Sequence, residues 1–265
     1  MIPYLELPHL HLGPVAVSSS RVLVAVGIFV GHLMLIRRAR RTGRDPALAA
    51  TLSLWMVLAG FAGAHLFKLL YLPGIGSVLS KRPWFAFDLF NGLASFGGIF
   101  AGLAGGLVYL WQRKLSASEA LGYLDVVAYA FPFAWIFGRV ACALTHDHPG
   151  VWSSSWLAVR YPDGPRWDLG LLEVFYILLV LTLFLLLDQR RRRAGFYLAL
   201  FLVLYGPFRL VLDQLHVDVV RYLGWSVDQW AGAAATLAGL SVWAAIAPLR
   251  RREAAPGFVI AGGGS

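Results

Sequence analysis

Residues 169–187 read LGLLEVFYILLVLTLFLLL, and this run decides the fold class of the chain. It contains one charged residue, Glu173, and the segment DQRRRR follows it at residues 188–193. A helix of about 20 predominantly apolar residues crosses the hydrocarbon core of a bilayer. The run therefore predicts a membrane-spanning helix that ends beside a cluster of arginines.

Comparable apolar runs occur along the rest of the chain. Of the 265 residues, 58% are hydrophobic and only 14% are charged, whereas a soluble domain carries about 25% charged residues. This composition excludes a soluble enzyme and a disordered chain, and the single cysteine, Cys142, excludes a disulfide-stabilised secreted scaffold. We predict an all-α polytopic membrane protein with seven transmembrane helices, at about residues 22–36, 46–71, 96–111, 120–138, 169–187, 195–213 and 230–249.

The positive charges predict the orientation of these spans. The net charge is +9, and 14 of the 23 lysines and arginines lie in four clusters, at residues 37–44, 113–114, 190–193 and 250–252. Because cytoplasmic loops are enriched in lysine and arginine, we expect the N-terminus outside and the C-terminus in the cytoplasm. Residues 72–83 and a small extracytoplasmic subdomain at 139–168 would then lie outside. We expect one domain over 1–253 without a cleavable signal peptide, and a C-terminal tail at 254–265 that includes a linker-like GGGS.

Several ionisable residues fall inside or at the ends of the predicted spans, where a charge is costly and marks a candidate functional site. They are Arg139, Arg209, Glu173, Asp213, His65 and Lys68. Each has a structural interpretation as well. Arg209 can pair with Asp213 one turn later. Glu173 can pair with Arg166, or the helix dipole can stabilise its carboxylate near the helix N-terminus. Lys68 can extend to the membrane–water interface. The glycines at 98, 102 and 106 are typical of closely packed helices.

The segment THDHPG at residues 145–150 is a second candidate. Histidine titrates near neutrality, so His146, with Asp147, is a candidate acid or base beside Arg139; a solvated loop without function is an equal alternative. Two histidines around one aspartate lack a third ligand of defined spacing, so we predict no metal and no cofactor. Cys142 alone is typical of an inert apolar residue.

Arg139 and Arg209 come from different spans, and both are expected near the outer leaflet. A guanidinium group matches the oxygens of a phosphate in two-pronged fashion, and lipid phosphates lie at that depth. The sequence therefore predicts a site that holds a lipid phosphate, close to groups that could transfer a lipid-derived group.

At these residues the chain resembles the prolipoprotein diacylglyceryl transferase family, over most of its length. The matching segments, in chain order, are LGPVA at 12–16, GAHL at 63–66, GLASFGG at 92–98, GR at 138–139, Asp147, Glu173 and YGPFR at 205–209. Five positions depart from the family pattern: its histidine aligns with Gly97, a tyrosine with Ser20, an asparagine with Cys142, an arginine with His65 and a glutamate with Asp213.

The resemblance implies transfer of a diacylglyceryl group from phosphatidylglycerol to the thiol of a prolipoprotein's lipobox cysteine, on the outer face of the bacterial inner membrane. Together with this resemblance, we predict the catalytic residues Arg139, Arg209, His146, Asp147 and Tyr205. The substrate-binding residues that it implies are Gly138, Cys142, Glu173, Asp213, His65, Ser95 and Gly98. Arginines would stabilise the departing phosphate, and a base would generate the thiolate.

The departures leave three interpretations. His146, or less readily His65, acts as the base in place of the residue missing at Gly97. Alternatively, a related enzyme transfers a lipid-derived group to a non-protein acceptor, or the protein binds phospholipid without catalysis. We expect a phospholipid and an acceptor as partners, no nucleic acid, and a monomer.

Overall fold

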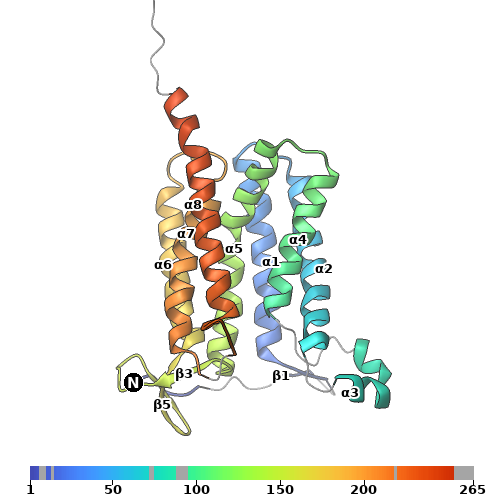
Figure 1. Cartoon of the computed structure of the whole chain (residues 1–265), viewed down its shortest axis with the longest axis vertical. Coiled ribbons are helices and arrows are strands. Elements are labelled where there is room, and N and C mark those ends of the chain that lie inside the picture. Colours follow the sequence, from blue (N-terminus) through green and yellow to red (C-terminus); the bar gives the residue numbers. More distant parts are fainter. Residues whose placement is uncertain (6–9, 13–14, 72–74, 88–94, 218–219, 254–265) are drawn as a thin grey trace, which may run out of the picture. The chain divides into compact units, whose positions relative to one another are not determined.

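The chain is largely helical in a computed structural model that describes residues 1–5, 10–12, 15–71, 75–87, 95–217 and 220–253 (Figure 1). The long helices are α1 (Ser19–Arg41), α2 (Pro46–Tyr71), α4 (Ser95–Gln112), α5 (Ala117–Thr145), α6 (Leu169–Leu187), α7 (Phe196–Leu212) and α8 (Val227–Glu253). Parts of the motifs at 12–16 and 92–98, and the tail at 254–265, lie outside the described residues.

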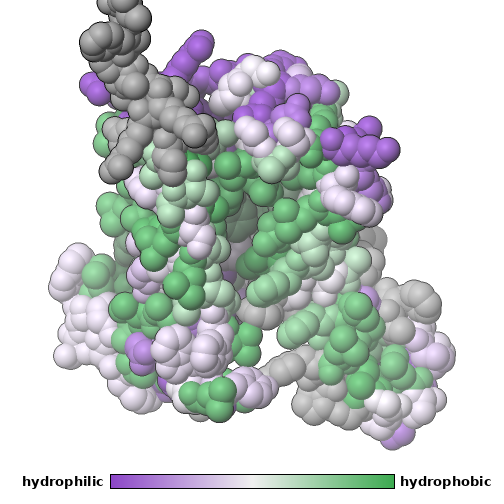
Figure 2. All heavy atoms as spheres, turned by 45° about the horizontal axis from the view of Figure 1, so that its top comes forward, coloured by the Kyte–Doolittle hydropathy of each residue, from purple (hydrophilic) through white to green (hydrophobic). Residues whose placement is uncertain are grey.

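Six of these helices are long and apolar enough to cross a membrane, within the described part of the chain: Ser19–Arg41, Pro46–Leu70, Ala117–Thr145, Leu169–Leu187, Phe196–Leu215 and Val227–Ala247. The prediction of an all-α polytopic membrane protein is thereby confirmed. The expected span at 96–111 is helix α4, which is not among these six. Apolar side chains cover much of the face seen in Figure 2, and exposed leucines such as Leu58 and Leu179 suit a lipid environment.

The chain divides into two compact units, Ala25–Ala134 and the combination of Met1–Val24 with Trp135–Ser265. In the first, α2 and α4 pack closely, and a core of Leu35, Leu52, Tyr109, Leu110, Tyr123 and Val126 is buried. The single domain expected over 1–253 stays a prediction.

Glycines hold α2 and α4 together, as their spacing predicted. A Cβ atom at Gly97 would collide with Cβ of Phe67 and lie 2.7 Å from the carbonyl oxygen of Gly63. A Cβ atom at Gly98 would lie 3.3 Å from the carbonyl oxygen of Gly60. A histidine at position 97 would therefore require the two helices to separate, so this chain's packing depends on the residue that departs from the family pattern.

We expect Gly97→Ala to destabilise the protein by about 1–3 kcal/mol, because the added methyl group overpacks the α2–α4 contact. Gly76→Ala is the matched control, since a Cβ atom at this exposed position meets nothing within 4 Å. Thermal unfolding of the detergent-solubilised variants measures both effects. Equal unfolding temperatures for the two variants would contradict the packing argument.

The second unit contains α6, α7, α8 and the last part of α5, together with short strands. Strands β3 (Pro149–Trp152), β5 (Gly164–Asp168) and β4 (Val159–Tyr161) form an antiparallel sheet in the order β3-β5-β4, and residues Arg221–Tyr222 (β6) pair with Trp225–Ser226 (β7). Leu10–Leu12 (β1) and Val15–Val17 (β2) form another antiparallel pair in this unit.

Two expectations about loops are wrong. Residues 139–145 are the end of α5 rather than loop, because RVACALT continues the helix until His146 adopts a left-handed backbone (φ 54°) and Pro149 follows. The expected loop at 72–83 contains helix α3 (Ile75–Lys81), and a 3-10 turn, Pro83–Phe87, follows it. The first correction is important for the site, because it places Arg139 and Cys142 on one helix, one turn apart.

Candidate active site

A buried glutamate joins the two arginines that the sequence singled out. Oε2 of Glu173 lies 3.2 Å from Nε of Arg139 and 3.5 Å from a terminal nitrogen of Arg209. The Glu173 side chain is 1% exposed, and those of Arg139 and Arg209 are 12% and 16% exposed. Three different helices, α5, α6 and α7, thus bring their charges to one point.

Two aromatic residues complete the surroundings of the carboxylate. The indole Nε1 of Trp135 donates a hydrogen bond to Oε1 of Glu173 at 3.0 Å, and the hydroxyl of Tyr205 donates to the same oxygen at 2.8 Å. The Arg139 guanidinium also lies over the Trp135 ring, 4.4 Å from its centroid. A buried carboxylate with these partners is held in one orientation.

Helical spacing explains how the sequence builds this centre. Trp135 and Arg139 are four residues apart on α5, and Tyr205 and Arg209 are four residues apart on α7, so each pair shares one helix face. Glu173 lies in the second turn of α6. Asp168 caps the N-terminus of this helix, because its side chain accepts a hydrogen bond from the Leu171 backbone amide at 2.9 Å. Buried charges of this kind require such pairing.

The two ion pairs that the sequence suggested, Arg209 with Asp213 and Arg166 with Glu173, are wrong. Arg209 makes its shortest ion pair with Asp228 of α8, at 2.8 Å, rather than with Asp213. Arg166 pairs with Asp163 at 2.7 Å and stacks on Trp152, so Glu173 is not its partner. Asp228 was missed by the sequence analysis, because no spacing rule relates it to Arg209.

Asp213 has a structural environment. It is buried, and it accepts a short hydrogen bond from the Ser226 hydroxyl. Ser226 also accepts from the Gln229 amide at 3.0 Å, while its own amide donates to Oε1 of Gln229 at 3.0 Å. This reciprocal pattern is a capping box at the start of α8, so Asp213 joins the end of α7 to the beginning of α8.

His146 lies in a separate network. Its Nδ1 is 2.7 Å from Oδ2 of Asp168 and its Nε2 is 3.1 Å from the carbonyl oxygen of Leu5. The ring stacks on Tyr4 at 3.9 Å between centroids. The Tyr161 hydroxyl donates to the same Asp168 oxygen at 2.8 Å, and burial with the adjacent carboxylate raises the pKa of Tyr161. Both nitrogens of His146 thus face acceptors, and the network fastens the N-terminal segment to the β3–β5 region.

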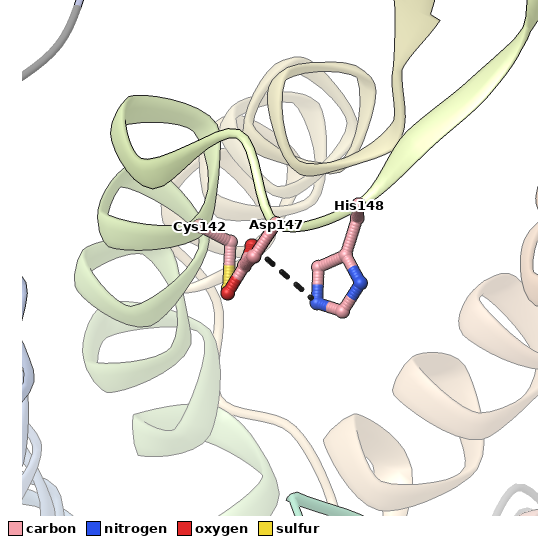
Figure 3. Close-up of side chains that lie close together, drawn as sticks. All are labelled: Cys142, Asp147 and His148. Atoms are coloured by element: carbon pink, nitrogen blue, oxygen red, sulfur yellow. Dashed lines mark ion pairs between the residues drawn. The ribbon is translucent and has the colours of Figure 1, made fainter. Parts of the chain in front are cut away.

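Cys142, Asp147 and His148 lie together at the end of α5 (Figure 3), and one ligand atom from each falls within 4.8 Å of the others. Nε2 of His148 is 3.7 Å from Oδ1 of Asp147. The side chain of Asp147 therefore faces His148 rather than His146, the residue with which the sequence analysis grouped it. Burial, opposed by the Asp147 charge and aided by the charge of Arg139, lowers the pKa of His148.

The remaining predicted site residues are divided between the two units. Gly138 precedes Arg139, and a Cβ atom there would meet nothing within 4 Å, so the helix surface beside the arginine is open. His65 is buried on α2 and Gly98 lies on α4, both in the unit Ala25–Ala134. Ser95 begins α4, and its side chain lies outside the described residues.

The two arginines of the centre are paired unequally with carboxylates. Oε2 of Glu173 meets the two guanidinium groups at ion-pair distance without a hydrogen bond. Among the described residues, no carboxylate pairs with the terminal nitrogens of Arg139. Asp228, the second partner of Arg209, is 42% exposed and can be displaced into solvent. A phosphate could therefore bind both arginines without removing the buried carboxylate.

These features define an integral membrane protein with a buried cluster of ion-paired side chains between its helices. The family model of prolipoprotein diacylglyceryl transferase matches residues 8–245, and the chain belongs to this family. A phosphatidylglycerol–prolipoprotein diacylglyceryl transferase of Frankia alni is 31% identical over 84% of this chain and 61% of its own length. Proteins of the same name from Frankia casuarinae and Paenarthrobacter aurescens are 28% and 26% identical, over 87% and 91% of this chain and 58% and 82% of their own lengths.

The chain spans about three-fifths of the length of the two Frankia relatives. Its membership and its apolar helices make it an integral protein of the bacterial inner membrane.

Proposed function

We propose that this protein transfers a diacylglyceryl group from phosphatidylglycerol to the thiol of a prolipoprotein cysteine. The observation that carries the proposal is the buried centre in which Arg139 and Arg209, from two membrane-spanning helices, share the carboxylate of Glu173. Placing two cations at this depth is costly, and the phosphate of a phospholipid is a ligand that would repay both. The names of the relatives support the same reaction.

The reaction assigns a role to each group of the centre. The acceptor's sulfur attacks the glyceryl carbon that carries the phosphate, a carbon–sulfur bond forms, and the carbon–oxygen bond breaks. The bonding pair leaves on the phosphate oxygen, so glycerol phosphate departs with an additional negative charge and the thiol loses its proton. Arg139 and Arg209 stabilise that developing charge. Glu173, held by Trp135 and Tyr205, keeps the two guanidinium groups aligned.

The membrane topology is part of the proposal. With α4 as a seventh span, the four basic clusters fall on one side, and the N-terminus lies outside. The end of α5, the start of α6 and the β3–β5 sheet then face the periplasm, which places the arginine centre at the outer leaflet. His146 and Asp147, on this side, are the predicted acid–base residues; for His146 this role requires release of its bond to the Leu5 carbonyl.

Purified protein in nanodiscs with headgroup-labelled phosphatidylglycerol tests the activity directly. We expect a lipobox peptide to gain the mass of a diacylglyceryl group while labelled glycerol phosphate is released in equal amount. A peptide in which serine replaces the lipobox cysteine controls for the thiol. Release of glycerol phosphate without modification of the peptide would indicate a non-protein acceptor. The absence of both glycerol phosphate and modified peptide would contradict the proposed function.

A further inference from the structure

The two terminal nitrogens of Arg209 are paired with two carboxylates of different exposure. Nη1 lies 3.5 Å from Oε2 of Glu173, whose side chain is 1% exposed, and Nη2 lies 2.8 Å from Oδ2 of Asp228, whose side chain is 42% exposed. We propose that Asp228 is a displaceable countercharge. Its carboxylate holds Arg209 until the phosphate of phosphatidylglycerol takes its place, and it returns to Arg209 when glycerol phosphate leaves. This role rests on the proposed function.

The two carboxylates differ in how firmly their surroundings hold them. Glu173 is buried, and it accepts hydrogen bonds from Trp135 and Tyr205. Within the described residues, Asp228 has one ion pair, the one with Arg209. An exposed carboxylate that leaves its partner regains water, so such a pair contributes little to stability. Asp228 is therefore the carboxylate that an incoming anion displaces more easily.

The start of α8 stabilises Asp228 after it releases Arg209. Asp228 lies in the first turn of this helix, where the helix dipole favours a carboxylate. The hydroxyl of Ser226 accepts a hydrogen bond from the Gln229 amide at 3.0 Å, and this bond caps the helix. Because the cap is supplied by Ser226, the Asp228 side chain can rotate away from Arg209 without uncapping the helix.

The aromatic residues around Asp228 are typical of a membrane–water interface. Trp225 and Trp230 are exposed, and their rings lie 5.0 Å apart between centroids. The indole Nε1 of Trp230 donates a hydrogen bond to the carbonyl oxygen of Tyr222 at 3.1 Å. Tryptophan and tyrosine are enriched at the depth of the lipid headgroups. We therefore expect the phosphate of a bilayer lipid to reach Arg209 at the depth where Asp228 lies.

The exchange keeps the charge of the centre constant when the lipid binds. The two arginines and two carboxylates sum to zero, and a lipid phosphate with one negative charge in place of Asp228 gives the same sum. Glycerol phosphate carries an additional negative charge, so the arginines attract it more strongly than they attract the lipid. A carboxylate that competes for Arg209 and repels this product assists its release.

Binding of phosphatidylglycerol to Asp228→Asn tests the exchange without relying on activity. Asparagine keeps the size of the side chain but carries no charge to be displaced. We expect half-saturation at about 3- to 10-fold less phosphatidylglycerol than wild type requires, the effect of one weak ion pair. Native mass spectrometry of the full chain from phosphatidylcholine nanodiscs, with increasing amounts of phosphatidylglycerol, measures it.

Two further variants control for the charge and for the fold. Asp228→Glu retains the carboxylate and should bind the lipid as wild type does. Asp163→Asn removes an exposed carboxylate from another arginine, Arg166, and should also change nothing. A damaged fold would weaken binding, so the direction of the change separates the exchange from a structural role. Half-saturation of Asp228→Asn at the wild-type amount of phosphatidylglycerol, or at more, would overturn the proposal.

Inhibition of transfer by glycerol phosphate tests the return of Asp228 to Arg209. We expect Asp228→Asn to be inhibited at about 10-fold lower glycerol phosphate than wild type, with a smaller decrease in KM for phosphatidylglycerol. Equal inhibition of the two proteins would overturn the role in product release. Tighter lipid binding by Asp228→Asn without transfer by wild type would contradict the proposed function and leave the exchange standing. Transfer by wild type with unchanged lipid binding by Asp228→Asn would contradict the exchange alone.

Discussion

Arg209→Gln is expected to lower diacylglyceryl transfer by about 100- to 1,000-fold, the usual cost of removing one group that stabilises developing negative charge. Arg209 contacts Glu173 at 3.5 Å and Asp228 at 2.8 Å. A glutamine at this position is uncharged and can form neither ion pair. The loss should appear mainly in kcat, because the phosphate carries more charge when it leaves than when it binds. Steady-state transfer to a lipobox peptide measures it.

Arg166→Gln is the matched control for this variant. Arg166 belongs to the same compact unit and pairs with the exposed Asp163, but unlike Arg209 it does not pair with the buried Glu173, and a surface pair contributes little. We expect near wild-type transfer. If Arg209→Gln were as active as Arg166→Gln, the arginine centre would not be the site of chemistry.

Glu173→Gln is expected to destabilise the protein by about 3–5 kcal/mol, because it leaves two largely buried guanidinium groups without their shared countercharge. The amide oxygen can still accept from Trp135 and Tyr205, so the change isolates the charge from the hydrogen bonds. Thermal unfolding in detergent measures the loss, and Asp163→Asn, at an exposed carboxylate, is the control.

Phosphatidylglycerol should restore part of the stability that Glu173→Gln loses. The phosphate of the lipid supplies the negative charge that the arginines then lack, and a ligand that binds only the folded protein stabilises it. An uncharged lipid such as diacylglycerol should not restore it. Equal stabilisation by both lipids would show that the arginines do not bind the phosphate.

The fold class was predictable because an apolar run of about 20 residues forms a membrane-spanning helix and few other structures. The ends of the helices were less predictable. Residues 139–145 contain alanine and leucine as well as polar residues, and the helix stops only where His146 adopts φ 54°. Helix α4 was predicted to within one residue at each end, and the glycines that allow its close packing against α2 were visible in the sequence.

The arginine centre was predictable only in part. The cost of a charge within a span identified Arg139, Arg209 and Glu173, and spacing by four residues placed Trp135 and Tyr205 beside them in retrospect. Asp228 could not be found this way, because it lies on α8 whereas Arg209 lies on α7, and no sequence spacing relates the two residues. The sequence also grouped His146 with Asp147, whereas the structure pairs His146 with Asp168 and turns Asp147 toward His148. Contacts between distant segments decide such partners.

In the proposed function, Arg139 and Arg209 together hold the phosphate of a phospholipid. Native mass spectrometry of protein extracted from defined nanodiscs measures this most directly, with the double variant Arg139→Gln/Arg209→Gln compared against Arg160→Gln/Arg166→Gln. We predict that wild type and the control retain one phosphatidylglycerol in preference to a zwitterionic phospholipid, and that the double variant loses the preference. Unchanged retention of phosphatidylglycerol by a folded Arg139→Gln/Arg209→Gln variant would show that the two arginines do not hold the phosphate.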